Sequence, residues 1–231
     1  MIMKKLTIPL SRFELIFGWI YLPFQLLVLP SLLLIVNLFL GNPFSESEIN
    51  FIYFCLNFLV VTVAFRRFLI HSAKRSLSSP MRCLQSAFFG FVLYWAASIG
   101  LSSVIVYIDP SFFNVNDESI NAMVKESAQL MAIGTVFLVP VVEEVLYRGL
   151  IFRGLYNRSK IAAYVVSSLA FSAIHVVGYI GLYDAQHLLL CLLQYLPAGL
   201  CLGWSYARAD SIWAPILIHI TINQIGILSM G

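Results

Sequence analysis

Charge is what this sequence has least of. Only 11% of its 231 residues are charged and 60% are hydrophobic, whereas about a quarter of the residues in a typical soluble domain are charged. The mean hydropathy is +0.89, so an ordinary soluble domain is excluded and the length suits one membrane domain. The apolar runs are long and lack the alternation of β-barrel strands, which predicts an all-α, polytopic transmembrane helical bundle.

Other features are missing too. The four cysteines show no paired spacing, which argues against a disulfide framework or a thiolate metal site. The net charge of +3 comes from basic residues scattered between apolar runs rather than gathered on one face, so no nucleic-acid partner is expected. The chain also shows no internal repeat, whereas transporters commonly carry repeated halves.

The apolar runs predict seven membrane spans, with Pro23 and Pro30 kinking or tilting the overlong first one. Their approximate bounds are 13–40, 49–65, 83–108, 129–147, 161–181, 187–206 and 212–230.

The charges between these spans predict the topology. Of the 14 lysines and arginines, only Lys125 lies in a connection that follows an odd-numbered span. The others, Lys4 and Lys5 included, precede the first span or lie in connections that follow even-numbered spans. By the positive-inside rule the even side is cytoplasmic. We therefore expect a multi-pass protein of the cell membrane, in contact with membrane lipid, whose N-terminus is cytoplasmic and whose C-terminus is outside.

The fourth span carries ionisable residues, which are expensive at membrane depth and indicate function. Glu144 and Arg148 are four residues apart and share a helical face, so they can form an internal ion pair. Glu143 is rotated from Glu144 by about 100° and is left free. A carboxylate in an apolar pocket suits general acid–base work, although the cluster could also merely end a span at the cytoplasmic interface.

Two later spans carry histidines. His175 follows Phe171 by one helical turn in the fifth span, and His219 shares a face with Asn223 in the seventh. Alone, each could be a hydrogen-bonded packing group, but polar groups on three separate spans favour a shared site. These groups can meet if the fourth helix continues through Gly149 to Leu155, because a helix that stops at Tyr147 leaves the glutamates at the boundary.

Three motifs carry a resemblance to a known family. The sequence reads Glu143-Glu144-Val-Leu-Tyr-Arg148, then Phe171-Ser-Ala-Ile-His175, then His219-Ile-Thr-Ile-Asn223. In that order they resemble the EExxxR, FxxxH and HxxxN motifs of the CPBP family, which comprises CAAX proteases and bacteriocin-processing enzymes and is also called Abi. The resemblance implies two parts: spans 1–128 without a recognised motif, and a protease core over 129–231.

The resemblance implies roles for these residues. Glu143 would activate a water molecule with help from His175, and His219 and Asn223 would stabilise the oxyanion. Glu144, Arg148 and Phe171 would support the site. The family has also been described as metalloproteases, and Glu144, His175 and His219 could then bind a divalent metal such as zinc. There is no His-Glu-x-x-His segment, so the soluble zinc-protease pattern does not apply.

The sequence thus predicts an intramembrane endopeptidase that hydrolyses a peptide or membrane-protein substrate with an activated water molecule. The same residues leave open a non-catalytic immunity or regulatory protein of the same fold, a proton-coupled transporter, or a structural bundle with polar contacts between helices. Its oligomeric state is not indicated by the sequence.

Overall fold

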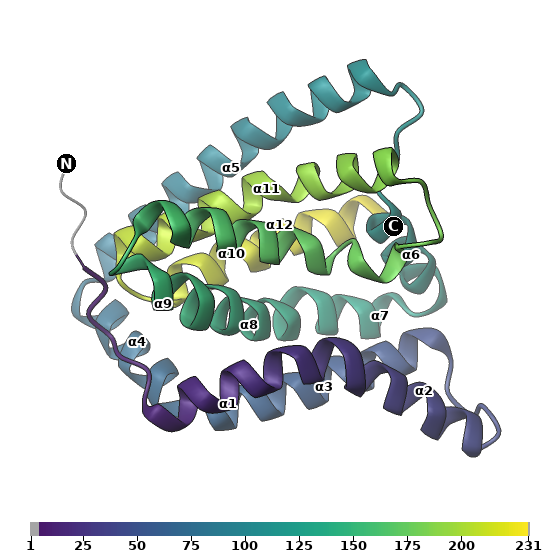
Figure 1. The fold of residues 1–231 in the computed structure, drawn as a ribbon, viewed down its shortest axis with the longest axis horizontal. Helices are drawn as coiled ribbons and strands as arrows, with labels where there is room; N and C mark the ends of the chain where they lie inside the picture. Colours follow the sequence, from purple (N-terminus) through teal and green to yellow (C-terminus); the bar gives the residue numbers. More distant parts are fainter. Residues whose placement is uncertain (1–4, 231) are drawn as a thin grey trace.

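The protein, seen in a computed structural model that describes residues 5–230, is a bundle of helices (Figure 1). Lys4 lies outside the described residues. Within residues 5–230, the only β-type pairing is an isolated bridge between Ile180 and Tyr183. The predicted all-α, polytopic architecture is therefore confirmed.

Six of the described helical stretches are long and apolar enough to cross a membrane. Two of them are composite, since their backbone changes type along the way. The first runs through α1 (Arg12–Pro23), the π-helix η1 (Phe24–Val28) and α2 (Leu29–Phe39). The other four are α3 (Glu46–Ala64), α5 (Pro80–Ile108), α11 (Ala185–Ala209) and α12 (Trp213–Met230).

The fourth predicted span is the second composite stretch. It runs from Ala128 to Tyr156 without a break, so the expectation that this helix continues past Gly149 is confirmed. Its parts are α7 (Ala128–Met131), η2 (Ala132–Leu138), α8 (Val139–Glu143), η3 (Glu144–Phe152) and α9 (Arg153–Tyr156). The segments η2 and η3 are π-helical. The sequence does not predict them, and such π segments are common at functional sites.

The fifth span is shorter than predicted. Its helix, α10, covers Lys160–Ile174, only 15 residues or about 22 Å at 1.5 Å per residue, less than the ~30 Å hydrocarbon core. The predicted bounds 161–181 are therefore wrong at the C-terminal end. After His175 the chain forms the short 3₁₀ helix η4 (Val177–Tyr179) and turns at Gly181, where φ is +88°. A count of seven spans stays a prediction.

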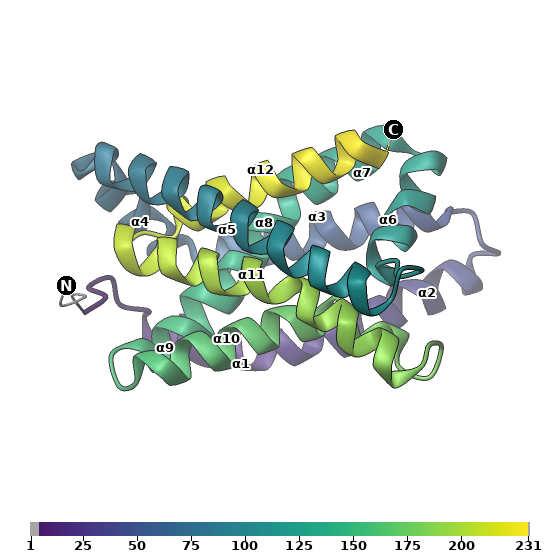
Figure 2. The ribbon, with the colours of Figure 1, turned by 90° about the horizontal axis from the view of Figure 1, so that it is seen from above.

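Two helices lie outside the long ones, at opposite ends of the bundle (Figures 1 and 2). One end carries α4 (Arg66–Ser78) together with α9 and the described start of the chain. The other end carries α6 (Val115–Glu126), the turn between α2 and α3, and the end of α12. We call these the α4 end and the α6 end.

Two of the central helices, α10 and α11, approach closely at a glycine. A Cβ atom on Gly199 would lie 2.8 Å from the backbone Cα of Ser168, so a larger residue there would force the two helices apart. This close approach brings the Gly199 carbonyl within reach of the fourth span.

The first helix carries a buried charge, Glu14, that the apolar pattern of the sequence does not indicate. Glu14 lies inside the first apolar run and is only 1% exposed. Its Oε2 accepts the backbone N–H of Ser11 in a capping box, and its Oε1 accepts the N–H of Phe68 from α4. The carboxylate therefore links the first helix to α4 at the α4 end.

Candidate active site

A cavity of about 1180 Å³ penetrates the bundle from the α6 end. The side chains at its inner part come from three spans: Glu143 from α8, Phe171 and His175 from the end of α10, and His219 and Asn223 from α12. The structure therefore brings at least one polar residue from each of the three sequence motifs to one space. Because α10 is short, His175 lies at the helix end inside this cavity, where irregular backbone is tolerated at membrane depth.

Glu144 and Arg148 form an ion pair beneath the cavity. Arg148 Nη1 lies 2.9 Å from Glu144 Oε1, and both side chains are fully buried. Arg148 Nη2 also donates to the Gly199 carbonyl at 3.4 Å, and the guanidinium carbon lies 4.2 Å from the centroid of the Phe171 ring. The ion pair expected from the four-residue spacing is thus present, and it joins the fourth span to α10 and α11.

His219 lies between the two glutamates. Its Nδ1 is 2.9 Å from Glu144 Oε1, and its Nε2 is 3.8 Å from Glu143 Oε2. A carboxylate paired with arginine only accepts hydrogen bonds, so Nδ1 of His219 donates to Glu144. In the neutral imidazole, Nε2 is then an acceptor that faces Glu143.

Glu143 is the less constrained of the two glutamates. Its side chain is 15% exposed, toward the cavity, whereas that of Glu144 is fully buried. Its Oε2 has no hydrogen-bond partner among the described residues. The structure therefore leaves an unpaired carboxylate oxygen beside an imidazole nitrogen at the inner end of the cavity.

The ring of the second histidine, His175, is oriented by a hydrogen bond to the end of its own helix. His175 Nδ1 donates to the Phe171 carbonyl at 2.9 Å, which leaves Nε2 as the ring nitrogen without that bond. Its ring stacks on that of Tyr195, from α11, with centroids 4.1 Å apart. Phe171 contacts the rings of both histidines, at centroid distances of 4.9 Å to His175 and 5.6 Å to His219.

Asn223 is held against the π-helical part of the fourth span. Its Nδ2 donates to the Thr135 carbonyl at 2.8 Å, which uses one of the two amide hydrogens. The other amide hydrogen remains for a ligand. This contact also fixes α12 against η2.

Two participants could not be found from the sequence. Tyr195 sits in a mostly aliphatic run that looks like ordinary helix packing, and Thr135 contributes only a backbone carbonyl. The Tyr195 hydroxyl lies 3.2 Å from Asn114 Oδ1 and 3.1 Å from Asp117 Oδ1, and it accepts from Asn116 Nδ2 at 3.1 Å. Tyr195 therefore links His175 to α6.

The α6 end of the cavity is polar. Asn114, Asn116, Asp117 and Ser119 line it, along with Glu46 from α3. Asp117 lies in this concave region, and desolvation by the surrounding protein raises the pKa of its carboxyl, although the Tyr195 hydroxyl bond opposes that shift. On another side the wall is apolar, formed by Leu26 of η1 and by Pro30, Leu33 and Leu34 of α2.

The described residues do not form a metal centre. No group of three or more histidine, cysteine, aspartate or glutamate side chains within residues 5–230 is arranged to hold a metal ion. In the predicted set, Glu144 Oε1 is occupied by Arg148 and by His219 Nδ1, and only its Oε2 has no hydrogen-bond partner. The metalloprotease prediction is therefore not supported by this geometry.

Comparison with known proteins agrees with the motifs. The sequence model of the family described as "Type II CAAX prenyl endopeptidase Rce1-like" matches residues 125–225. The matched stretch contains all three motifs, from Glu143 to Asn223. The chain is also 26% identical, over 223 residues, to a Bacillus subtilis (strain 168) protein named "Putative membrane peptidase YdiL", covering 90% of this chain and 84% of that protein. No solved structure matches it.

Proposed function

We propose that this protein is a CPBP family member, a CAAX-type intramembrane endopeptidase that hydrolyses a peptide bond with water activated by Glu143. The observation that carries the proposal is the unpaired Oε2 of Glu143 beside His219 at the inner end of a cavity large enough for a peptide segment. The match of residues 125–225 to a CAAX endopeptidase family model and the likeness to a protein named as a membrane peptidase support the reaction class.

The first step of the proposed reaction is attack of water on the peptide carbonyl carbon. Glu143 takes a proton from the water as the new carbon–oxygen bond forms, and the carbonyl oxygen becomes an oxyanion. His219 and Asn223 lie on the α12 side of the cavity, where the Nε2–H of a protonated His219 ring and the second amide N–H of Asn223 can stabilise that oxyanion. Glu143 then returns the proton to the leaving nitrogen, and the carbon–nitrogen bond breaks.

The remaining residues have positioning roles in this proposal. Glu144 holds the His219 ring through Nδ1, and Arg148 holds Glu144. His175 assists Glu143 with its free Nε2, in an orientation set by Phe171 and Tyr195. In the same proposal, residues 129–231 form the protease core and residues 1–128 the other spans, though α2, α3 and α6 also line the cavity.

Purified protein in detergent tests the function directly. We expect the wild type to cleave peptides from a panel of prenylated and leader-type sequences, and to keep that activity after a chelator is added. Loss of activity with the chelator would contradict a glutamate mechanism that needs no metal. Absence of cleavage across the panel would instead favour a regulatory or immunity protein of this fold.

Replacing Tyr195 tests the link between His175 and α6. Tyr195→Phe keeps the ring that stacks on His175 and removes the hydroxyl that contacts Asn114, Asn116 and Asp117. We expect kcat for cleavage to fall by about 2- to 10-fold. This corresponds to the loss of one ordinary hydrogen bond, which contributes about 0.5–1.5 kcal/mol. Tyr195→Leu, which removes the ring as well, should lose more, as measured by kcat with saturating peptide. Equal activity of both variants and the wild type would refute a positioning role.

A further inference from the structure

The basic residues of the described chain gather at one end of the bundle, and the cavity lies toward the other. Apart from the buried Arg148 and from Lys125 on α6, every described lysine and arginine lies at or near the α4 end: Lys5, Arg12, Arg66, Arg67, Lys74, Arg75, Arg82, Arg153, Arg158, Lys160 and Arg208. The α6 end carries Glu46, Glu48, Asp109, Asp117, Glu118, Glu126 and Asp184. By the positive-inside rule, this asymmetry indicates that the basic end of the bundle lies in the cytoplasm.

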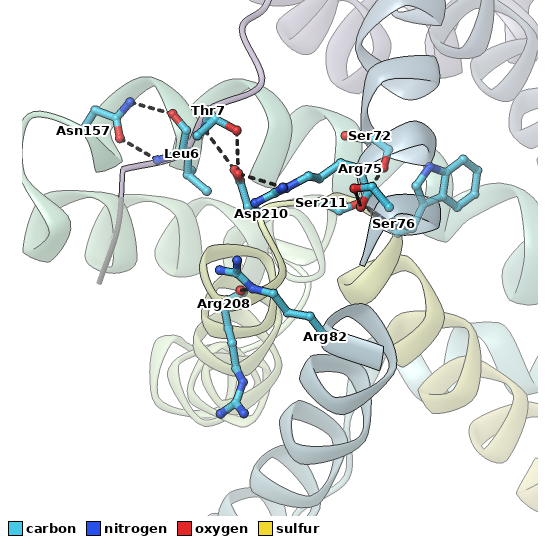
Figure 3. Close-up of polar contacts among 12 residues, drawn as sticks. Leu6, Thr7, Ser72, Arg75, Ser76, Arg82, Asn157, Arg208, Asp210 and Ser211 are labelled. Carbon is cyan, nitrogen blue, oxygen red and sulfur yellow. Dashed lines mark hydrogen bonds and ion pairs between the residues drawn. The ribbon is translucent and has the colours of Figure 1, made fainter. Parts of the chain in front are cut away.

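The α4 end is closed by a segment that crosses it. Residues 5–11 are not helical and lie across the helix ends (Figure 3). Leu6 exchanges two backbone hydrogen bonds with the Asn157 side chain, at 3.0 and 3.2 Å, and the Ile8 carbonyl accepts from Arg153 Nε. Leu6 and Ile8 are 4% and 7% exposed, so this segment is packed into the bundle and covers its α4 end.

A second set of contacts closes the turn between α11 and α12 at the same end. Asp210, in the left-handed conformation at φ +54°, accepts from the backbone N–H of Thr7 at 2.9 Å and from its hydroxyl at 2.6 Å. Arg75 of α4 lies 3.5 Å from the same carboxylate, and Ser211 contacts Ser76 at 2.7 Å (Figure 3). Thr7 of the crossing segment, α4 and this turn are thus held together by polar contacts.

The cavity does not reach this closed end. Within the described chain, its lining includes no residue of the crossing segment, of α4, of α9 or of the α11–α12 turn. It is lined instead by the α6-end halves of the spans and by α6 itself. Glu143 lies roughly midway along its 29-residue stretch, about 20 Å from Tyr156 at 1.5 Å per residue, and is approached from the α6 side.

We propose that the active-site cavity opens to the extracytoplasmic face of the membrane, so that the substrate is a polypeptide segment presented on the outer surface. This rests on the proposed peptidase function for the nature of the substrate, but the direction of the opening rests on the charge distribution and the cavity alone. Water reaches Glu143 from outside through the polar residues of α6. Segments of membrane proteins that are exposed only in the cytoplasm are excluded as substrates.

Cysteine labelling in intact spheroplasts tests the direction of the opening without any need for catalysis. Cys55, Cys83, Cys191 and Cys201 are replaced by alanine, and a single cysteine is introduced as Ser119→Cys in the cavity or Ser78→Cys at the exposed end of α4. A sulfonated, membrane-impermeant maleimide is added before or after permeabilisation. We expect Ser119→Cys to be labelled in intact spheroplasts, and Ser78→Cys only after permeabilisation.

The opposite pattern, or labelling of both positions before permeabilisation, would overturn the proposal. Ser111→Cys, in the exposed connection before α6, is a second reporter for the same face if Ser119→Cys does not accumulate. Its labelling only after permeabilisation would also overturn the proposal.

A cleavage experiment distinguishes failure of this inference from failure of the proposed peptidase function. A charged, impermeant peptide that the purified protein cleaves is added to spheroplasts, either free or joined to a transmembrane anchor that leaves it outside. Cleavage by intact spheroplasts, lost in Glu143→Gln, supports the proposal, and cleavage only after permeabilisation overturns it while the peptidase function stands. If labelling shows an outward cavity but purified protein cleaves nothing, the peptidase function fails and the outward opening stands.

Discussion

Glu143→Gln is expected to lower kcat for peptide cleavage by about 10²- to 10⁴-fold, the usual contribution of a positioned general base. The amide has nearly the same shape as the carboxylate but cannot take a proton from water. KM should change little, because Glu143 contributes a small, 15% exposed part of a large cavity wall. Steady-state rates of purified protein in detergent give both constants.

Glu118→Gln is the matched control for this variant. Glu118 lies on α6 beside two cavity residues, but it is exposed and does not itself line the cavity. The same chemical change there should leave kcat and KM at their wild-type values. Thermal unfolding should show that both variants remain folded. If Glu143→Gln kept near-wild-type kcat, another group would have to activate the water, and the proposed mechanism would be refuted.

The fold and the grouping of the site were largely predictable from composition and spacing. Long apolar runs predict the membrane helices, because each span must satisfy its own backbone in lipid. The four-residue spacing of Glu144 and Arg148 predicts their ion pair, because the pair shares a helical face. Family motifs on three separate spans predict that Glu143, His175 and His219 surround one space.

What could not be predicted depends on tertiary contacts. The end of α10 at Ile174 is set by the turn that follows, and the apolar residues beyond it look like more of the same span. The role of Glu14 at the α4 end depends on a backbone N–H of α4, which no local pattern shows. Tyr195 is held at the site by hydroxyl contacts to Asn114 and Asp117, which lie at the start of α6 and far from it in sequence.

Arg148→Met is expected to lower the free energy of unfolding by about 3–5 kcal/mol, because it leaves a buried carboxylate without its cation. Glu144 and Arg148 are both fully buried, so water cannot replace the lost partner. Glu144→Gln should destabilise the protein by a similar mechanism, because it leaves Arg148 as the unpaired charge. Reversible unfolding in mixed detergent micelles measures both changes, with Arg66→Met on the exposed face of α4 as a control expected to change stability little.

The double variant Glu144→Gln/Arg148→Met separates the stabilising role of the ion pair from its role in positioning. With both charges removed, most of the stability should return, since no unpaired charge remains buried. Cleavage should not return to the same extent, because the carboxylate that accepts from Nδ1 of His219 is gone and the ring is free to adopt another tautomer or orientation. Recovery of stability and activity in parallel would mean that the ion pair serves the fold alone and that His219 is positioned by other contacts.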